Sequence, residues 1–215
     1  HMKTIGYAAQ SAASRLAPFS FERRELRPND IAMEILYCGI CHTDLHQARN
    51  DWGWSQYPLV PGHEIVGRVL EIGSAVTCHK VGDAVAVGCM VDSCQHCDQC
   101  RKGEEQLCRE GNTQTYNDKD RITGERTYGG YSKHLVVREQ FALRVPDGLD
   151  LARAAPRVVH EVSELHHREL QHRPRLYAFG WTSSITLPSG SSKNASFKPI
   201  APLSIERSER NTPPR

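Results

Sequence analysis

Several features are missing from this sequence of 215 residues, and each absence excludes a class of protein. No apolar run approaches the roughly 20 residues that a membrane-spanning helix requires, so we expect no membrane partner. The formal net charge is only +2 and no basic patch with interleaved aromatic residues is present, so we expect no nucleic-acid partner. Neither G-x-G-x-x-G nor G-x-x-x-x-G-K-S/T occurs, so the sequence predicts no nucleotide-binding domain within these residues.

The first residues also lack the apolar stretch of a secretory signal peptide, so we expect a cytoplasmic protein. His1 precedes Met2, which is typical of an expression tag. Cysteines of a cytoplasmic protein are expected to be thiols. All eight lie at or before Cys108, and we expect three of them to be small buried or half-buried residues, namely Cys38, Cys78 and Cys89.

Residues 2–156 read as a β-rich globular domain. Short runs rich in Val and Ile alternate with turn residues, and they predict strands at residues 31–39, 64–72, 84–88, 131–137 and 142–145. Many short strands with few helices favour a barrel-like, mainly β unit. Residues 41–49 are the best helix candidate, with Thr43 or a preceding residue as its cap and with Leu45 and Ala48 facing the core.

Residues 157–215 have a different character and no recognisable domain. They are rich in Ser, Pro, Arg and His, contain no cysteine, and hold six of the twelve prolines. Prolines at this density interrupt long helices and strands. We expect this segment to be an atypical tail, produced by a shifted reading frame or by truncation and fusion.

Four cysteines occur at the spacing C-x2-C-x2-C-x7-C, namely Cys94, Cys97, Cys100 and Cys108. Zinc is commonly held by four thiolates in a tetrahedron, and closely spaced loop cysteines reach one centre at little cost in loop closure. A pair of disulfides is the alternative, which a cytoplasmic location disfavours. The spacing therefore predicts a closed, structural zinc site.

A second set of metal-ligand types lies upstream. Cys41 and His63 offer a thiolate and an imidazole, the mixed ligands of catalytic zinc, and Glu64 offers a carboxylate oxygen. Asp44 is placed to accept the second ring N–H of His63. By spacing alone this cluster is weak, because a cysteine is often a small buried residue and a lone histidine usually has no special role.

The order of several motifs carries a resemblance to a known family. They are Tyr37-Cys38-Gly39-Ile40-Cys41-His42-Thr43-Asp44, Pro61-Gly62-His63-Glu64-Ile65-Val66-Gly67, Val81-Gly82-Asp83-Ala84-Val85, the four-cysteine run and Gly129-Gly130-Tyr131. Residues 2–156 resemble the zinc-dependent medium-chain alcohol dehydrogenases/reductases, and most of all the cinnamyl-alcohol-dehydrogenase-like aldehyde reductases. The resemblance implies a GroES-like β-barrel catalytic domain that carries the four-cysteine zinc lobe.

The resemblance also implies roles for individual residues. Cys41 and His63 would be catalytic zinc ligands, with Glu64 able to enter the zinc shell and Asp44 as the outer partner of His63. Thr43 would pass a proton to the alkoxide and His46 would relay it to water, while His42 would lie at the cofactor. The implied activity is NADP(H)-linked interconversion of aldehydes and primary alcohols, on small-molecule substrates. Aromatic residues nearby would line an apolar substrate pocket or be ordinary core or surface residues: Trp52, Trp54 and Tyr57.

Departures from the family pattern qualify this expectation. The family carries a third zinc thiolate shortly after the position of Pro156 and continues into a Rossmann domain, and neither is found here. We therefore expect a catalytic zinc site with an incomplete ligand set, weak or no zinc binding there, and impaired activity. Replacement of the missing ligand by His160, His166 or His167 is disfavoured. Apolar surface left uncovered favours a homo-oligomer. The alternative function is a non-catalytic zinc-binding structural or assembly module.

Overall fold

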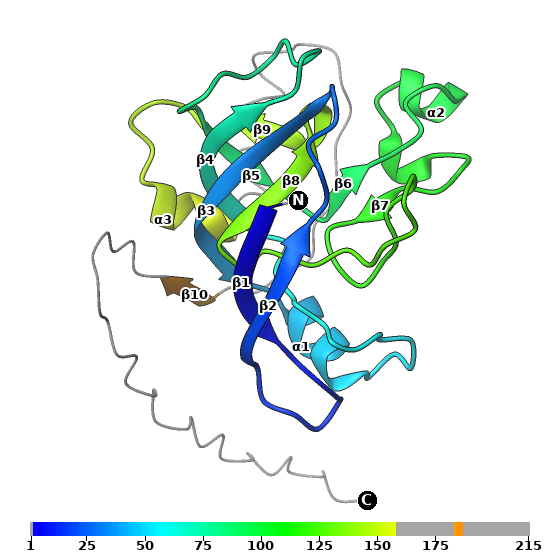
Figure 1. Cartoon of the computed structure of the whole chain (residues 1–215), viewed down its shortest axis with the longest axis vertical. Coiled ribbons are helices and arrows are strands. Elements are labelled where there is room, and N and C mark those ends of the chain that lie inside the picture. Colours follow the sequence, from blue (N-terminus) through cyan, green and yellow to red (C-terminus); the bar gives the residue numbers. More distant parts are fainter. Residues whose placement is uncertain (1, 158–182, 187–215) are drawn as a thin grey trace, which may run out of the picture.

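The computed structural model describes residues 2–157 and 183–186 (Figure 1). Strands dominate this part of the chain, and every strand pairing in it is antiparallel. The expectation of a mainly β unit is therefore confirmed, and the parallel sheet of a nucleotide-binding domain is not among these residues. No helix in the described part of the chain has the length and apolar character needed to cross a membrane.

The main sheet is organised around one long strand. Its members are β3 (Asp30–Ile40), β4 (Ile65–Ile72), β5 (Ala84–Val87), β8 (His134–Arg138), β9 (Ala142–Arg144) and β10 (Ser183–Thr186). One edge of β3 pairs with β4. Its other edge pairs first with β8 and then, at Tyr37–Ile40, with β10. β3 ends at Ile40, so Cys41 follows this strand directly.

The core follows from the alternation of apolar residues along these strands. Ile31, Met33 and Ile35 of β3 point to one side, as expected for a strand, and pack against Ile65 and Val69 of β4. A smaller cluster on the other side of the sheet is closed by α3 (Leu151–Ala154) and η3 (Ala155–Arg157). Both faces of β3 are therefore largely buried, and its register with β4 shifts between Ala32 and Met33 and between Ile35 and Tyr37.

An N-terminal hairpin, which the sequence patterns did not predict, covers part of the sheet. It joins β1 (Met2–Ala8) to β2 (Ala17–Arg23). Arg23 is buried and donates hydrogen bonds to the carbonyl oxygens of Tyr128, Gly129 and His134. These hydrogen bonds attach the hairpin to the start of β8 and to the segment before it.

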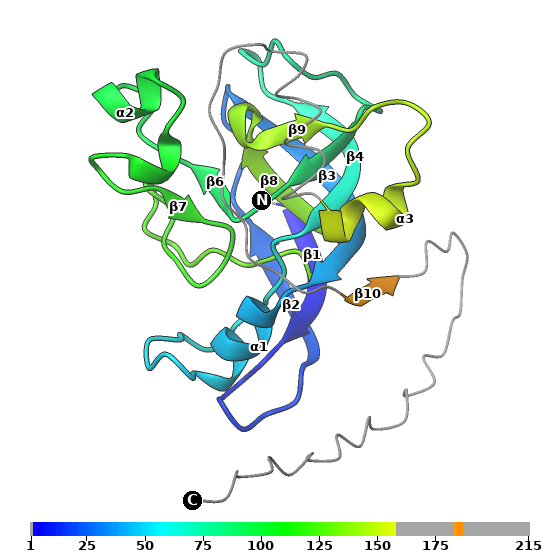
Figure 2. The same cartoon turned by 180° about the vertical axis from the view of Figure 1, so that it is seen from behind.

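Two smaller units project from the sheet, as Figures 1 and 2 show. One is the lobe between β6 (Met90–Asp92) and β7 (Thr113–Gln114), which contains α2 (Asp98–Arg101) and η1 (Glu105–Leu107). The other contains α1 (His42–Arg49), which begins where β3 ends. A short turn, η2 (Glu139–Phe141), joins β8 to β9.

The predicted strands and the helix at 41–49 are present, and the strand ends differ by at most three residues. The predicted core face of that helix is wrong: Leu45 is exposed, whereas Asp44 and Gln47 are buried. The reason is local, because Asp44 is drawn inward by hydrogen-bond donors rather than by apolar contact. Of the three cysteines expected to be buried or half-buried, only Cys38 is, since Cys78 and Cys89 are exposed.

Candidate metal centres

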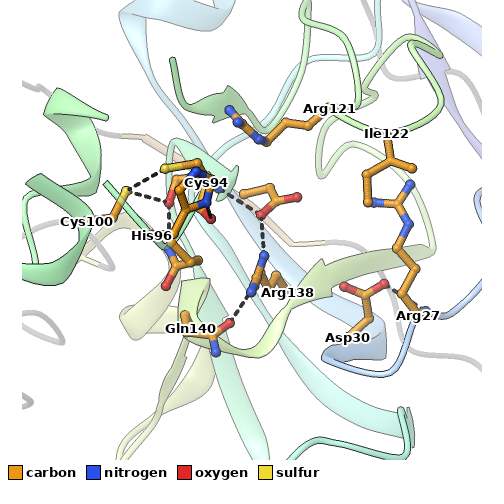
Figure 3. Close-up of polar contacts among 12 residues, drawn as sticks. Arg27, Asp30, Cys94, His96, Cys100, Arg121, Ile122, Arg138 and Gln140 are labelled. Carbon is orange, nitrogen blue, oxygen red and sulfur yellow. Dashed lines mark hydrogen bonds and ion pairs between the residues drawn. The ribbon is translucent and has the colours of Figure 1, made fainter. Parts of the chain in front are cut away.

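The four cysteines of the lobe converge on one point. Their sulfur atoms all lie within 4.8 Å of one another, and those of Cys94 and Cys100 are 3.8 Å apart (Figure 3). A tetrahedron with zinc–sulfur bonds of about 2.3 Å has sulfur–sulfur edges of about 3.8 Å. All eight cysteines of the chain are free thiols in the structure. The donor set and its spacing therefore fit a zinc ion.

Backbone N–H groups are directed at these sulfur atoms. The N–H of Cys97 donates to the Cys94 sulfur at 3.3 Å, and the N–H of Cys100 donates to the Cys97 sulfur at 3.4 Å. Hydrogen bonds from the backbone N–H groups of Arg109 and Cys100 lower the pKa of the Cys97 thiol to about 6. Donors of this kind stabilise thiolates, which are the form that binds zinc.

A second cluster lies where β3 meets the chain entering β4. The ligand atoms of Cys41, His63 and Glu64 lie within 4.8 Å of one another, and all three residues are buried. Their meeting follows from the pairing of the two strands, because the Gly39 N–H donates to the Glu64 carbonyl oxygen at 2.8 Å. Cys41 then stands at the start of α1, opposite His63.

Asp44 is the hub that organises this cluster. Its carboxylate accepts the backbone N–H groups of Cys41 at 3.0 Å and Gly62 at 2.9 Å, and the hydroxyl of Tyr131 at 3.2 Å. Its Oδ1 lies 3.4 Å from Nδ1 of His63. Burial opposes the charge of Asp44, but these partners outweigh it and lower the pKa of the carboxyl. Asp44 thus lies in ion-pair contact with the ring that it was predicted to orient.

Charges within the cluster are arranged as an ion pair. Burial disfavours a charged His63, but its hydrogen bonds to Asp44 and Cys41 prevail and raise its pKa to about 11. The hydrogen bond from His63 is in turn the main cause that lowers the pKa of the Cys41 thiol. Without a metal, a proton therefore lies between the His63 ring and the Cys41 sulfur. A zinc ion would replace this proton, because metal ligation requires a neutral imidazole and a thiolate.

Glu64 supplies a second sign that the cluster is built for a cation. Its Oε2 is buried and has no hydrogen-bond partner, and burial raises the pKa of the carboxyl to about 7. Gly39 makes room for it, since a Cβ there would lie 2.1 Å from that oxygen. A buried carboxylate without a partner is costly unless a cation or a proton neutralises it. The residues of this cluster therefore also fit a zinc ion.

The other predicted site residues take different positions. Thr43 lies two residues after Cys41 in α1, and its hydrogen bonding adds to that of His63 in lowering the pKa of the Cys41 thiol. His46 is half exposed and binds Asp51 through Nδ1 at 2.8 Å. His42 is exposed at the start of α1. The structure thus brings Thr43 to the cluster and places His46 and His42 towards solvent.

Of the neighbouring aromatic residues, Trp52 and Trp54 are exposed and Tyr57 is half-buried. Trp52 and Trp54 stack with ring centroids 5.9 Å apart, and they are 48% and 53% exposed. The Trp52 ring also lies 5.3 Å from that of His46. Tyr57 donates its hydroxyl to the Ala48 carbonyl oxygen. A pair of exposed tryptophans therefore lies beside His46 of α1.

Several contributors to the cluster had no clear signal in the sequence. Tyr131 was seen only as part of a glycine-rich motif, yet its hydroxyl reaches Asp44. Tyr116 stacks on the His63 ring at 5.8 Å. Gly62 has φ +103°, a backbone conformation that favours glycine, and this orients its N–H towards Asp44. Only Gly62 could have been found, because it lies in a Pro-Gly pair next to His63.

The antiparallel barrel and its two clusters of metal-ligating side chains define a zinc-type GroES-like domain, and comparison with known proteins agrees. The family model described as the alcohol dehydrogenase GroES-like domain matches residues 27–147. This chain therefore belongs to that family, within the zinc-dependent medium-chain dehydrogenases.

Named relatives point the same way. Cinnamyl alcohol dehydrogenase 8 of Arabidopsis thaliana is 50% identical over 154 residues, which cover 72% of this chain and 42% of the relative. NADP-dependent alcohol dehydrogenase C 1 of Mycolicibacterium smegmatis is 51% identical over 157 residues, covering 72% and 45%. The structure of a cinnamyl alcohol dehydrogenase from Sorghum bicolor is 43% identical with a TM-score of 0.71, and the match covers 78% of this chain and 48% of that one. This chain spans less than half the length of the curated relatives it matches.

Proposed function

We propose that this chain is the zinc-binding catalytic part of an alcohol dehydrogenase/aldehyde reductase that interconverts small aldehydes and primary alcohols with NADP(H). The observation that carries the proposal is the buried cluster of Cys41, His63 and Glu64, held by Asp44. Family membership supports the reaction class, and the NADP-dependent relative supports the choice of cofactor.

The residues would divide the work by their positions. When bound between Cys41 and His63, zinc would act as a Lewis acid towards the carbonyl oxygen, and NADPH would supply the hydride. Asp44 would fix the orientation of His63 through the contact of its Oδ1 with the ring nitrogen Nδ1. Thr43 follows Cys41 by two residues at the start of α1 and would pass a proton towards the substrate oxygen.

Two further residues complete the assignment. His46 is half exposed beside Asp51 and would exchange that proton with water. His42 projects from the start of α1 and would contact the nicotinamide cofactor. The four-cysteine site would hold a second zinc whose role is structural, because four thiolates leave no position for a substrate.

The zinc site next to Cys41 is proposed to be weak in this chain. Three ligands, one of them a carboxylate, leave the set short of the thiolate that family members place after Pro156, and the histidines at 160, 166 and 167 lie outside the described residues. We also propose that residues 2–156 form the domain, with residues 157–215 as a separate, atypical tail. Activity of this polypeptide would then be low compared with a full-length relative.

A direct assay tests the proposal. The zinc-loaded chain is mixed with NADPH and a series of aromatic and aliphatic aldehydes, and NADPH consumption is followed at high protein concentration. We expect slow, aldehyde-dependent consumption that the Cys41→Ser variant abolishes and the Cys78→Ser control retains. Cys78 is an exposed thiol outside both clusters, so it controls for the loss of a sulfur atom.

The alternative is a non-catalytic zinc-binding assembly module, and the four-cysteine lobe favours it because that lobe is complete by itself. Absence of aldehyde-dependent NADPH consumption in a chain with zinc bound at Cys41 and His63 would reject the catalytic proposal for this polypeptide. Zinc binding at the lobe is common to both functions and does not distinguish them.

A further inference from the structure

We propose that Cys94, His96 and Glu110 form an exposed zinc-acquisition site, which receives the ion from solvent and passes it to the four-cysteine site. The ligand atoms of these three residues lie within 4.8 Å of one another. Cys94 belongs to both groups, so its sulfur can keep hold of an ion while the other ligands are exchanged. The proposal rests on the four-cysteine zinc site proposed above.

The histidine is oriented as a metal ligand. Nδ1 of His96 lies 2.8 Å from the carbonyl oxygen of Cys94, and because a carbonyl only accepts, Nδ1 carries the proton of that bond. Metal-binding histidines usually donate their second ring nitrogen to such a carbonyl. Nε2 faces Glu110 and lies 2.6 Å from its Oε1, a contact in which the ring nitrogen donates, so a metal ion that binds here displaces that proton. Imidazole and carboxylate together are a donor pair that zinc accepts.

Glu110 is held in place from its other side. Arg121 lies 3.0 Å from Oε2 of Glu110 and also donates to the Glu110 carbonyl oxygen at 3.3 Å. Figure 3 shows His96 beside Cys94, with the Arg121 side chain extending towards them. Arg121 thereby keeps one carboxylate oxygen directed at His96, while its positive charge limits the affinity for a cation. A transfer site must release its ion, and a weak site does so.

Exposure falls in steps along the proposed route. The side chains of His96 and Glu110 are 67% and 49% exposed, whereas Cys100 and Cys108 are only 4% and 9% exposed as residues. Cys94 and Cys97 are intermediate. A hydrated ion can therefore reach His96 and Glu110 without any opening of the lobe, and the Cys94 sulfur is the next ligand inward.

The exchange itself is simple. The Cys94 thiolate stays bound, and His96 and Glu110 are replaced by the sulfur atoms of Cys97, Cys100 and Cys108, whose protons pass to solvent. Four thiolates bind zinc far more tightly than one thiolate, one imidazole and one carboxylate, since zinc is a borderline-soft ion. Transfer inward is therefore downhill, and the reverse path is the route for metal exchange.

Metal exchange on the zinc-loaded full chain tests the proposal. Cd²⁺ alone is added in the Cys41→Ser background, which removes a thiolate of the other cluster, and the growth of sulfur-to-cadmium absorbance is followed. We expect the double variant His96→Gln, Glu110→Gln to exchange about tenfold more slowly than its parent. Glu71→Gln removes the same charge on β4, where Glu71 is exposed, and should exchange at the parent rate.

The direction of the change in exchange rate distinguishes a zinc-acquisition site from a purely structural role of His96 and Glu110. If His96 and Glu110 only stabilise the lobe, the double variant loosens the lobe and metal exchange becomes faster. Faster exchange or an unchanged exchange rate would overturn the proposal. Zinc content by mass spectrometry and the final cadmium spectrum check that both proteins still hold one ion with four sulfur ligands. A parent chain that holds no zinc at the lobe would instead reject the four-cysteine site itself.

Discussion

The two metal-ligand clusters use opposite means to bind an ion. In the lobe, four sulfur atoms from one short run of chain meet, and backbone N–H groups from the same run support them. At β3 and β4, a thiolate, an imidazole and a carboxylate meet from two strands, and a single buried aspartate supports them. The first cluster is local, because one run of chain supplies all four ligands, whereas the second depends on the pairing of β3 with β4.

This difference explains how the two clusters can have different roles in one domain. A site that is complete by itself stabilises the loop that forms it, and a substrate finds no free position there. A mixed site with an unpartnered carboxylate oxygen has a position to exchange, at the cost of weaker binding. Stability should therefore depend mostly on the lobe zinc and on Asp44, and chemistry on the cluster of Cys41 and His63.

The largest effect is expected from breaking the lobe. Cys100→Ser removes a buried sulfur, and loss of the zinc should unfold residues of the lobe and cost about 5 kcal/mol or more of stabilisation. Zinc content and chemical denaturation measure both consequences. Cys78→Ser is the control, because Cys78 is exposed and outside both clusters. Full zinc retention in Cys100→Ser would show that the lobe does not need four thiolates.

Asp44→Asn should have the next largest effect. The amide loses the charge that His63 and the three hydrogen-bond donors face, so we expect a destabilisation of about 3 kcal/mol. Zinc binding at Cys41 should weaken, and zinc binding at the lobe should not change. Asp51→Asn, at a half-exposed pair with His46, should cost less than about 1 kcal/mol. Equal losses in the two variants, measured by urea unfolding, would contradict the role of Asp44 as the hub.

Gly39→Ala probes the space reserved for Glu64. The new Cβ would meet Glu64 Oε2 at 2.1 Å, so the carboxylate must move, and we expect a loss of about 2 kcal/mol together with weaker zinc binding at Cys41. Gly88→Ala is matched, because a Cβ there has no atom within 4 Å. Thermal unfolding measures the stability of the two variants, and cobalt absorbance measures their metal binding. A Gly39→Ala protein with wild-type metal affinity would show that Glu64 is not part of the site.

The smallest effect is the pH dependence of the zinc-free chain. Burial raises the pKa of Glu64 from 4.5 to about 7 in the folded protein. The contribution of Glu64 to the free energy of unfolding therefore falls as the pH rises from 4.5 to 7, and it does not change further above pH 7. The Glu64→Gln variant does not lose this contribution, so between pH 4.5 and 7 its free energy of unfolding should rise by on the order of 1 kcal/mol relative to wild type. Urea unfolding at several pH values measures the difference. Zinc should abolish it, and a gain that appears on acidification instead would contradict the sign.

Prediction from sequence succeeded where short-range pattern decides the structure. The spacing of the four cysteines was sufficient to place their sulfur atoms together, and strands such as β3 and β4 followed from their Val and Ile content. The hairpin of β1 and β2 was missed because β2 contains Pro18 and because the buried positions of β1 hold Thr4, Gly6 and Ala8 rather than large apolar residues. Its attachment through Arg23 is a long-range contact that no local pattern carries.

The mixed cluster shows the same limit. Cys41, His63, Glu64 and Asp44 were found through motifs that resemble a family, but Tyr131, Tyr116 and Gly39 were not assigned to it. Leu45 was expected to be buried because hydrophobicity was the only available signal, whereas α1 turns its polar side inward to bring Asp44 to four partners. Polar burial of this kind is decided by the partners, which lie far away in sequence.

Anomalous diffraction at the zinc edge, from crystals of the full chain grown with zinc, tests the central claim most directly. The two-centre account predicts one strong peak enclosed by the sulfur atoms of Cys94, Cys97, Cys100 and Cys108, and a second, weaker peak between the Cys41 sulfur and the His63 ring. No peak at Cys41 and His63 under saturating zinc, or disulfides in place of the first peak, would contradict it.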